Sequence, residues 1–116
     1  MQDVKTVEKQ LRIKTGGLNR YRKDLVSYNK EMDKEKQNLQ KLIEDEADEY
    51  SVKKKKEIIA EIEAVIESLK GKMHKQKEEV DDIVNACEEF PELKESEQYT
   101  KTQEVLKEAQ EYMANW

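Results

Sequence analysis

The residue types that most often act in catalysis or metal binding are rare in this sequence, and they do not occur together. The single histidine, His74, follows Met73, which falls on an apolar stripe, so its imidazole is expected to face solvent. Its lysine neighbours carry no lone pair for a metal at neutral pH. The single cysteine, Cys87, cannot form an internal disulfide and lies among apolar residues, which predicts a small core side chain. The sequence therefore predicts no metal site and no cofactor.

Acidic pairs and adjacent glycines are the next candidates, and neither has the spacing that its chemistry needs. Asp81 and Asp82 are consecutive, so on a helix their carboxylates point to different parts of the surface. Gly16 and Gly17 lack the Lys-Ser sequence and the preceding strand of a phosphate-binding loop. We interpret the carboxylates as solvated charges and the glycines as a kink or a close helix approach, with a hinge used in binding as the alternative. An enzyme is not expected.

Composition and charge exclude further classes of function. Of the 116 residues 42% are charged and 35% hydrophobic, which argues for one domain at most and against a thick globular core. A net charge of −5 makes nucleic acid a poor partner, and the short basic run Lys53 to Lys56 is interpreted as a solvated face. No run approaches the roughly 20 apolar residues of a membrane span, and the first residues do not resemble a signal peptide. We expect a soluble, intracellular chain with no membrane partner.

Apolar residues recur with heptad spacing, which predicts three helices in a single domain of residues 1–116. Helix 1 is expected at about 3–43, helix 2 at about 51–90 and helix 3 at about 95–114. An acidic stretch at 43–51 separates the first two helices, and Pro91 ends the second. Asp3 and Ser51 are the expected N-caps of the first two helices, and either Ser96 or Pro91 begins the third.

The expected architecture is all-α: an elongated antiparallel three-helix bundle with coiled-coil-like packing and a shorter third helix. Short turns make successive helices antiparallel neighbours. We expect core residues of the first two helices to face each other when their numbers sum to 94, as Val7 and Cys87 or Leu25 and Leu69 do. In this register no facing pair consists of two polar residues. The third helix is expected to stop near the level of residues 65–70.

Three local patterns resemble the tubulin folding cofactor A family, a family of small tubulin-binding chaperones. Residues 11–16, followed by Arg20 and Tyr28, resemble the family's IKTG signature in the first helix. Residues 49–54 are similar to the NYDIKKQ entry to the second helix, and Glu97-Gln98-Tyr99 with Val105-Leu106 to the EEYKEARLVL stretch of the third. The likeness covers nearly the whole chain in the same order, although Gly17 and Ser51 depart from the family pattern.

The resemblance implies a chaperone cofactor in the cytoplasm, associated with the cytoskeleton. It implies that the chain captures and buffers β-tubulin after its release from the cytosolic chaperonin and passes it on toward the αβ heterodimer. Other tubulin folding cofactors are further expected partners, and a monomer is favoured over a homodimer. The lysine run could steer association with an acidic tubulin surface. The alternative is a structural coiled coil or a homodimerising cytoskeletal protein.

A thin bundle offers no pocket, so a partner is expected to bind exposed apolar residues along the helices. The first candidates are Ile58, Ile62 and Val65, which the short third helix leaves partly uncovered in the expected bundle. Ordinary core packing under Tyr112, Trp116 or the tail is the competing interpretation. Tyr99 and Tyr112 on the third helix are the second candidates, because a tyrosine presents an apolar ring with a polar tip.

Overall fold

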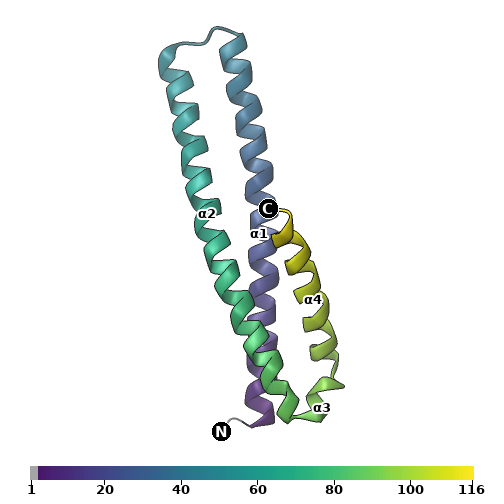
Figure 1. The fold of residues 1–116 in the computed structure, drawn as a ribbon. Helices are drawn as coiled ribbons and strands as arrows, with labels where there is room; N and C mark the ends of the chain where they lie inside the picture. The colour runs from purple at the N-terminus through teal and green to yellow at the C-terminus, as the bar shows by residue number, and fades with distance from the viewer. Residues whose placement is uncertain (1–2) are drawn as a thin grey trace. The chain divides into compact units, whose positions relative to one another are not determined.

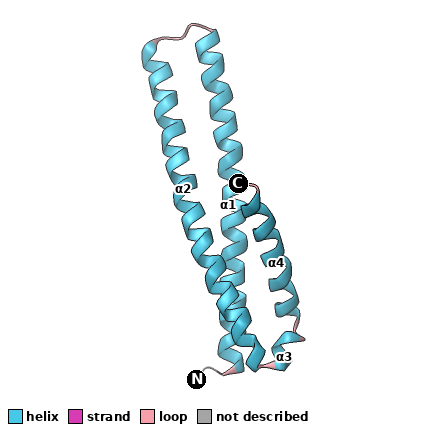
Figure 2. Cartoon of the chain, viewed as in Figure 1, coloured by secondary structure: helices cyan, strands magenta, loops and turns pink. Residues whose placement is uncertain are grey.

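The computed structural model describes residues 3–116, and every regular element in this range is helical (Figures 1 and 2). The elements are α1 (Val4–Glu44), α2 (Glu49–Ala86), the 3₁₀ turn η1 (Cys87–Glu89), α3 (Pro91–Lys94) and α4 (Glu97–Ala114). The all-α prediction is confirmed. The last helix has 18 residues against 41 and 38 in the first two, as the pattern predicts.

The chain divides into two compact units, which are described separately. Unit 1 contains residues 3–22 and 72–116, and unit 2 contains residues 23–71. The first unit thus combines the start of α1, the end of α2 and all of η1, α3 and α4. The second is a hairpin of the remaining parts of α1 and α2.

Side-chain caps fix the N-terminal ends of α1 and α2. The Asp3 carboxylate accepts a hydrogen bond from the Thr6 amide at 2.8 Å, which confirms the expected cap of α1. Asp48 caps α2 by accepting from the Ser51 amide at 2.7 Å, and hydrogen bonding to the Ser51 side chain and then to this amide holds the pKa of the Asp48 carboxyl below its usual value. The prediction that Ser51 is the cap is wrong, because Asp48 is an equally good cap one turn earlier. The four lysines therefore begin in the second turn, where the helix dipole disfavours them less.

Pro91 and Ser96 are the alternative starts of the expected third helix, and each of them begins a separate helix. Pro91 opens the single turn α3, and the Ser96 hydroxyl accepts from the Tyr99 amide at 3.1 Å to cap α4. The second helix ends at Ala86 rather than near 90, because the chain tightens into η1 before the proline.

The turn between α1 and α2 is closed by a Schellman motif. The Ala47 amide donates to the Leu42 carbonyl at 2.9 Å and the Glu46 amide donates to the Ile43 carbonyl at 3.2 Å. Glu46 has φ 55°, the left-handed conformation that this motif requires. The middle of the acidic stretch, residues 45–48, is thus a defined turn, and the two ends of the stretch belong to α1 and α2.

The core of unit 1 is formed by apolar side chains of all its helices. One cluster joins Val7 and Leu11 of α1 to Cys87 and Leu93, with less buried neighbours around them: Val4, Ile83, Val84, Phe90 and Tyr99. The cluster contains the pairs that the predicted register brings together, such as Val7 with Cys87. Cys87 is fully buried, as predicted, and burial raises the pKa of its thiol. Further residues buried in this unit are Leu18, Met73, Val80, Val105, Leu106 and Ala109.

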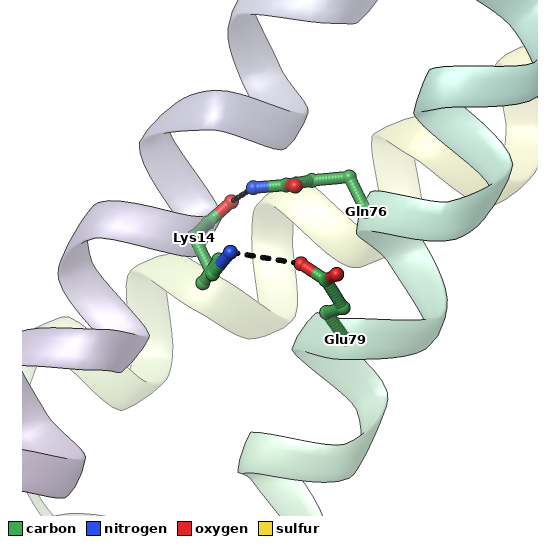
Figure 3. A network of polar contacts seen from close by, with 3 residues as sticks. All are labelled: Lys14, Gln76 and Glu79. Carbon is green, nitrogen blue, oxygen red and sulfur yellow. Dashed lines mark hydrogen bonds and ion pairs between the residues drawn. The ribbon is translucent and has the colours of Figure 1, made fainter.

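Polar contacts set the spacing of α1 and α2 within unit 1 (Figure 3). The Gln76 side-chain amide donates to the Lys14 carbonyl at 3.0 Å, and the Lys14 ammonium pairs with Glu79 at 2.9 Å. A Cβ on Gly17 would lie 2.7 Å from Gln76 Nε2, whereas a Cβ on Gly16 would meet nothing within 4 Å. Gly17 therefore allows the close approach of Gln76, and Gly16 has no such packing role.

Alanine substitutions should separate these two glycines. We expect Gly16→Ala to raise the free energy of unfolding by about 1 kcal/mol, because alanine favours a helix interior. In Gly17→Ala the same gain is offset by displacement of Gln76, whose hydrogen bond contributes about 1 kcal/mol. Urea denaturation of both variants is the measurement. Equal stabilisation by the two substitutions would contradict the role assigned to Gly17.

Unit 2 is held by a narrower core and one interhelical ion pair. Leu25, Ile59, Ile62 and Ile66 are buried. The Lys55 ammonium lies 2.7 Å from the Glu35 carboxylate and lowers the pKa of that carboxyl by hydrogen bonding to it. Glu35 and Lys55 are charged residues at core positions of the heptad pattern, and they neutralise each other across the hairpin.

Candidate partner-binding surface

The described part of the chain contains no cluster of His, Cys, Asp and Glu side chains that could hold a metal ion. His74 is exposed, and its ring lies edge-on to Trp116, with centroids 5.7 Å apart. Within residues 3–116 no helix combines the length and the apolar composition that a bilayer crossing needs. The surface hollows have open rims lined largely by charged and polar side chains, for example Glu8, Arg12, Glu97 and Lys101. Such surfaces suit binding to a macromolecule better than enclosing a small ligand.

The candidates on α2 differ in exposure. Ile58 and Val65 are each 39% exposed, so both present apolar surface to solvent, as Ile13 and Ile43 do at 54% and 52%. Ile62 is 7% exposed and belongs to the core of unit 2, so the expectation that it is partly uncovered is wrong. It lies four residues after Ile58 and points toward α1, because a core stripe in a two-helix hairpin faces the partner helix.

The two tyrosine candidates lie in unit 1. Tyr99 is half-buried and packs against the cluster of Val7, Leu11, Cys87 and Leu93. Tyr112 is half-buried too, and its ring contacts Trp116 edge-on with centroids 6.1 Å apart. Both rings thus contribute to packing within their own unit, and they are less available to a partner than Ile58 and Val65.

A further residue, Tyr50, belongs with the exposed residues of α2. It is 69% exposed, the largest exposed fraction among the large apolar and aromatic side chains of the described residues. At about 100° per residue, positions 50, 54, 58 and 65 fall within roughly 80° of one helix face. Exposed Glu61 falls within the same arc. We call Tyr50, Lys54, Ile58 and Val65 on this face the α2 stripe. It extends over about 22 Å of α2, at 1.5 Å per residue.

The Lys54 side chain contacts both the Tyr50 ring and the Glu57 carboxylate. Its ammonium lies 5.6 Å from the centre of the Tyr50 ring and 3.6 Å from the Glu57 carboxylate. An exposed cation–π contact of this kind contributes about 0.5–1 kcal/mol, and an exposed ion pair contributes up to about 1 kcal/mol. The contacts therefore orient the ring without removing it from solvent. Exposed apolar side chains with charges among and beside them can serve as a protein-binding surface.

Tyr50 is absent from the sequence-based candidates because the second helix is expected to begin at Ser51. That start places Tyr50 in the preceding turn, off any helix face. The helix begins at Glu49 and so includes Tyr50 in its first turn. The signal that could have found it is Asp48, which has the same capping chemistry as Ser51.

Sequence comparisons find a matching family and several relatives that share one name. Residues 6–106 match the sequence model of the family described as "Tubulin binding cofactor A". The protein named "Tubulin-specific chaperone A" from Gallus gallus is 29% identical over 98 residues, which cover 84% of this chain and 88% of that protein. Proteins of the same name from Mus musculus and Homo sapiens are each 28% identical over the same shares. No solved structure matches the chain.

Proposed function

Because the chain belongs to the tubulin binding cofactor A family, we propose that it captures and buffers β-tubulin after chaperonin release and passes it on toward αβ-heterodimer assembly. The family is a family of tubulin chaperones, and the likeness extends over most of the chain. The role proposed is binding without catalysis. A binding protein of this kind shields the apolar surface of an incompletely assembled subunit until the next partner takes it.

The observation that carries the proposal is the exposure of the α2 stripe. Ile58 and Val65 offer apolar contact on a helix face, and Tyr50 adds an aromatic side chain of the type enriched at interface hot spots. A helix face with apolar residues at such spacing can lie in an apolar groove of a partner. We therefore place the proposed β-tubulin contact at this stripe, with Tyr99 and Tyr112 as secondary contacts.

The proposal includes the form in which the chain acts. It acts as a monomer in the cytoplasm, as one domain in which the three longer helices form an elongated antiparallel bundle. Handing on the subunit brings other tubulin folding cofactors into contact with it. The absence of a bilayer-crossing helix in residues 3–116 is compatible with this setting.

Charge-introducing substitutions on the stripe test the proposal. We expect Ile58→Glu and Val65→Glu each to weaken capture of β-tubulin at least about 10-fold, because binding would bury an unpaired carboxylate. Ile13→Glu is the matched control, since Ile13 is 54% exposed on α1 and lies outside the stripe. The measurement is the dissociation constant for chaperonin-released β-tubulin, with circular dichroism to verify helicity. Stripe variants that bind as tightly as Ile13→Glu would refute the assignment.

Self-association through the same stripe is the rival function. It predicts a dimer of this chain at micromolar concentration and no complex with β-tubulin. Sedimentation of the chain alone and mixed with β-tubulin distinguishes the two. The proposed function requires a complex that contains β-tubulin, and a dimer indifferent to β-tubulin would replace it with the rival.

A further inference from the structure

Helix α4 packs into unit 1 through a small number of short side chains. Its buried residues are Thr102, Val105, Leu106 and Ala109. Leu106 is the only one of these four that is larger than valine, whereas the fully buried residues of α1 include Leu11 and Leu18. The apolar area that holds α4 in place is therefore small. Elements with few buried apolar contacts are the ones that open at the lowest free energy.

Polar groups make up much of the contact between α4 and α1. The hydroxyl groups of Thr15 and Thr102 are 2.9 Å apart, and Arg22 pairs with Glu108 at 2.9 Å. The Glu108 side chain is 53% exposed, so solvent weakens this ion pair. Nε of Arg22 is buried and has no hydrogen-bond partner among the residues that the structure describes, which disfavours the packed state. These contacts orient α4 on α1 and add little to its stability there.

The two ends of α4 are held differently. At its start, Ser96 caps the helix and Tyr99 packs against the buried cluster of unit 1. At its end, the Trp116 ring lies edge-on to His74 and Tyr112, and it remains 38% exposed. The C-terminal end is thus the less enclosed of the two, and we expect α4 to open from that end.

The spacing of the contacts is that of an amphipathic helix bound in a groove. The four buried residues of α4 stand at positions i, i+3, i+4 and i+7, the anchor positions of such a helix. On α1, residues spaced by four, three and four positions form the matching face. We call them the α1 docking face: Leu11, Thr15, Leu18 and Arg22. This face is a helix-binding surface that a helix of the same chain occupies.

We propose that α4 is a displaceable helix, and that an amphipathic helix of the captured protein takes its place on the α1 docking face. The inference rests on the proposed function and adds a second contact to the α2 stripe. A specific interface takes about 800 Å² from each partner, more than the three separated apolar side chains of the stripe supply. The incoming helix has short apolar side chains at the spacing of α4 and an acceptor for Arg22.

Hydrogen exchange tests the opening of α4 in the chain alone. A helix of 18 residues is marginally stable in water when it is undocked, so its amides exchange whenever α4 leaves α1. We expect the amides of Val105, Leu106 and Ala109 to exchange at least about 10-fold faster than those of Leu11 and Leu18. Equal protection of the two sets would overturn the inference, because α4 would then open only when all of unit 1 unfolds.

A reversible disulfide tests whether capture requires the opening. In Thr15→Cys/Thr102→Cys two thiols replace hydroxyl groups that are 2.9 Å apart, so oxidation joins α4 to α1. The oxidised form should capture β-tubulin at least about 10-fold more weakly than the reduced form of the same chain. The single variants Thr15→Cys and Thr102→Cys are the matched controls, and oxidation should not change their affinity, because the native Cys87 is fully buried.

Equal affinity of the oxidised and reduced double variant would overturn the inference. If Ile58→Glu still weakened capture in that case, the proposed function would stand without it. A dimer of the chain alone that exchanges α4 between two copies would also overturn the inference, because the α1 docking face would then serve a second copy. Sedimentation of the reduced chain without β-tubulin detects such a dimer.

A peptide titration decides whether the α1 docking face accepts a helix, even if the chain does not bind β-tubulin. A peptide with the sequence of residues 97–114 carries the docking pattern and competes with the tethered α4, so millimolar concentrations are required. In amide NMR spectra it should shift Leu11, Thr15 and Leu18 of the wild-type chain. The oxidised variant Thr15→Cys/Thr102→Cys should show shifts at least about threefold smaller at Leu11 and Leu18. Absence of shifts in the wild-type chain, or equal shifts in the two chains, would overturn the inference.

Discussion

Replacing Leu11 with alanine is expected to lower the free energy of unfolding by about 3–4 kcal/mol, a large part of the stability of a chain of this size. Leu11 is fully buried in the cluster that joins α1 to Cys87 and Leu93. Truncation removes apolar contacts and leaves a cavity that surrounding helices fill only in part, because their backbones are fixed by hydrogen bonds. Urea denaturation monitored by circular dichroism measures the change.

The control for Leu11 is two residues away on the same helix. Ile13 is 54% exposed, so Ile13→Ala should change the free energy of unfolding by less than about 0.5 kcal/mol. The comparison keeps the helix and its neighbourhood constant and varies only burial. Similar losses in the two variants would mean that the cluster around Leu11 does not stabilise unit 1.

The second large effect is expected at a buried pair of hydroxyl groups. Thr15 Oγ1 and Thr102 Oγ1 are 2.9 Å apart and join α1 to α4 in unit 1. Thr102 donates to the Gln98 carbonyl at 2.9 Å, which leaves Thr15 as the donor to Thr102. Thr102→Val removes the partner of a buried donor and should cost about 1–3 kcal/mol.

A double-mutant cycle distinguishes this polar contact from simple packing. Thr15→Val should cost less than Thr102→Val, because Thr102 keeps its contact with Gln98. The double variant Thr15→Val/Thr102→Val should recover to within about 1 kcal/mol of the wild type, since neither hydroxyl is then left unpaired. Additive losses in the cycle would show that the hydroxyl groups do not interact. Thermal or urea unfolding of the four proteins gives the required energies.

The spacing of apolar residues predicts the helices of this chain well, because side chains buried between two packed helices must recur about twice in seven residues. The buried residues of α1 recur every seven positions, as at Leu11, Leu18 and Leu25, and their neighbours on α2 follow the same spacing. The residue at which a helix begins is less well determined by the sequence. Asp48 and Ser51 are both good caps, and the choice between them depends on whether Glu49 and Tyr50 continue the helix.

The contacts of α4 could not be predicted from the seams of the first two helices. Thr15 and Arg22 are seven residues apart and lie beside the seam of α1, outside its two series of core positions. In unit 1 Thr15 contacts Thr102, and the Arg22 guanidinium lies 2.9 Å from Glu108. A heptad identifies the face between two helices and does not specify the flank on which a third helix packs. For the same reason, the heptad pattern does not predict how exposed the residues of the α2 stripe are, because they lie outside the face between two helices.

The burial of Cys87 makes the chain suitable for site-specific labelling. It is the only cysteine, its side chain is fully enclosed, and the raised pKa of the thiol keeps it in the unreactive protonated form. A thiol introduced at Ser68, which is exposed and lies on the same side of α2 as Val65, would therefore react alone with a maleimide dye. Attachment of a fluorophore there would report occupancy of the neighbouring stripe in real time, without first removing the native sulfur.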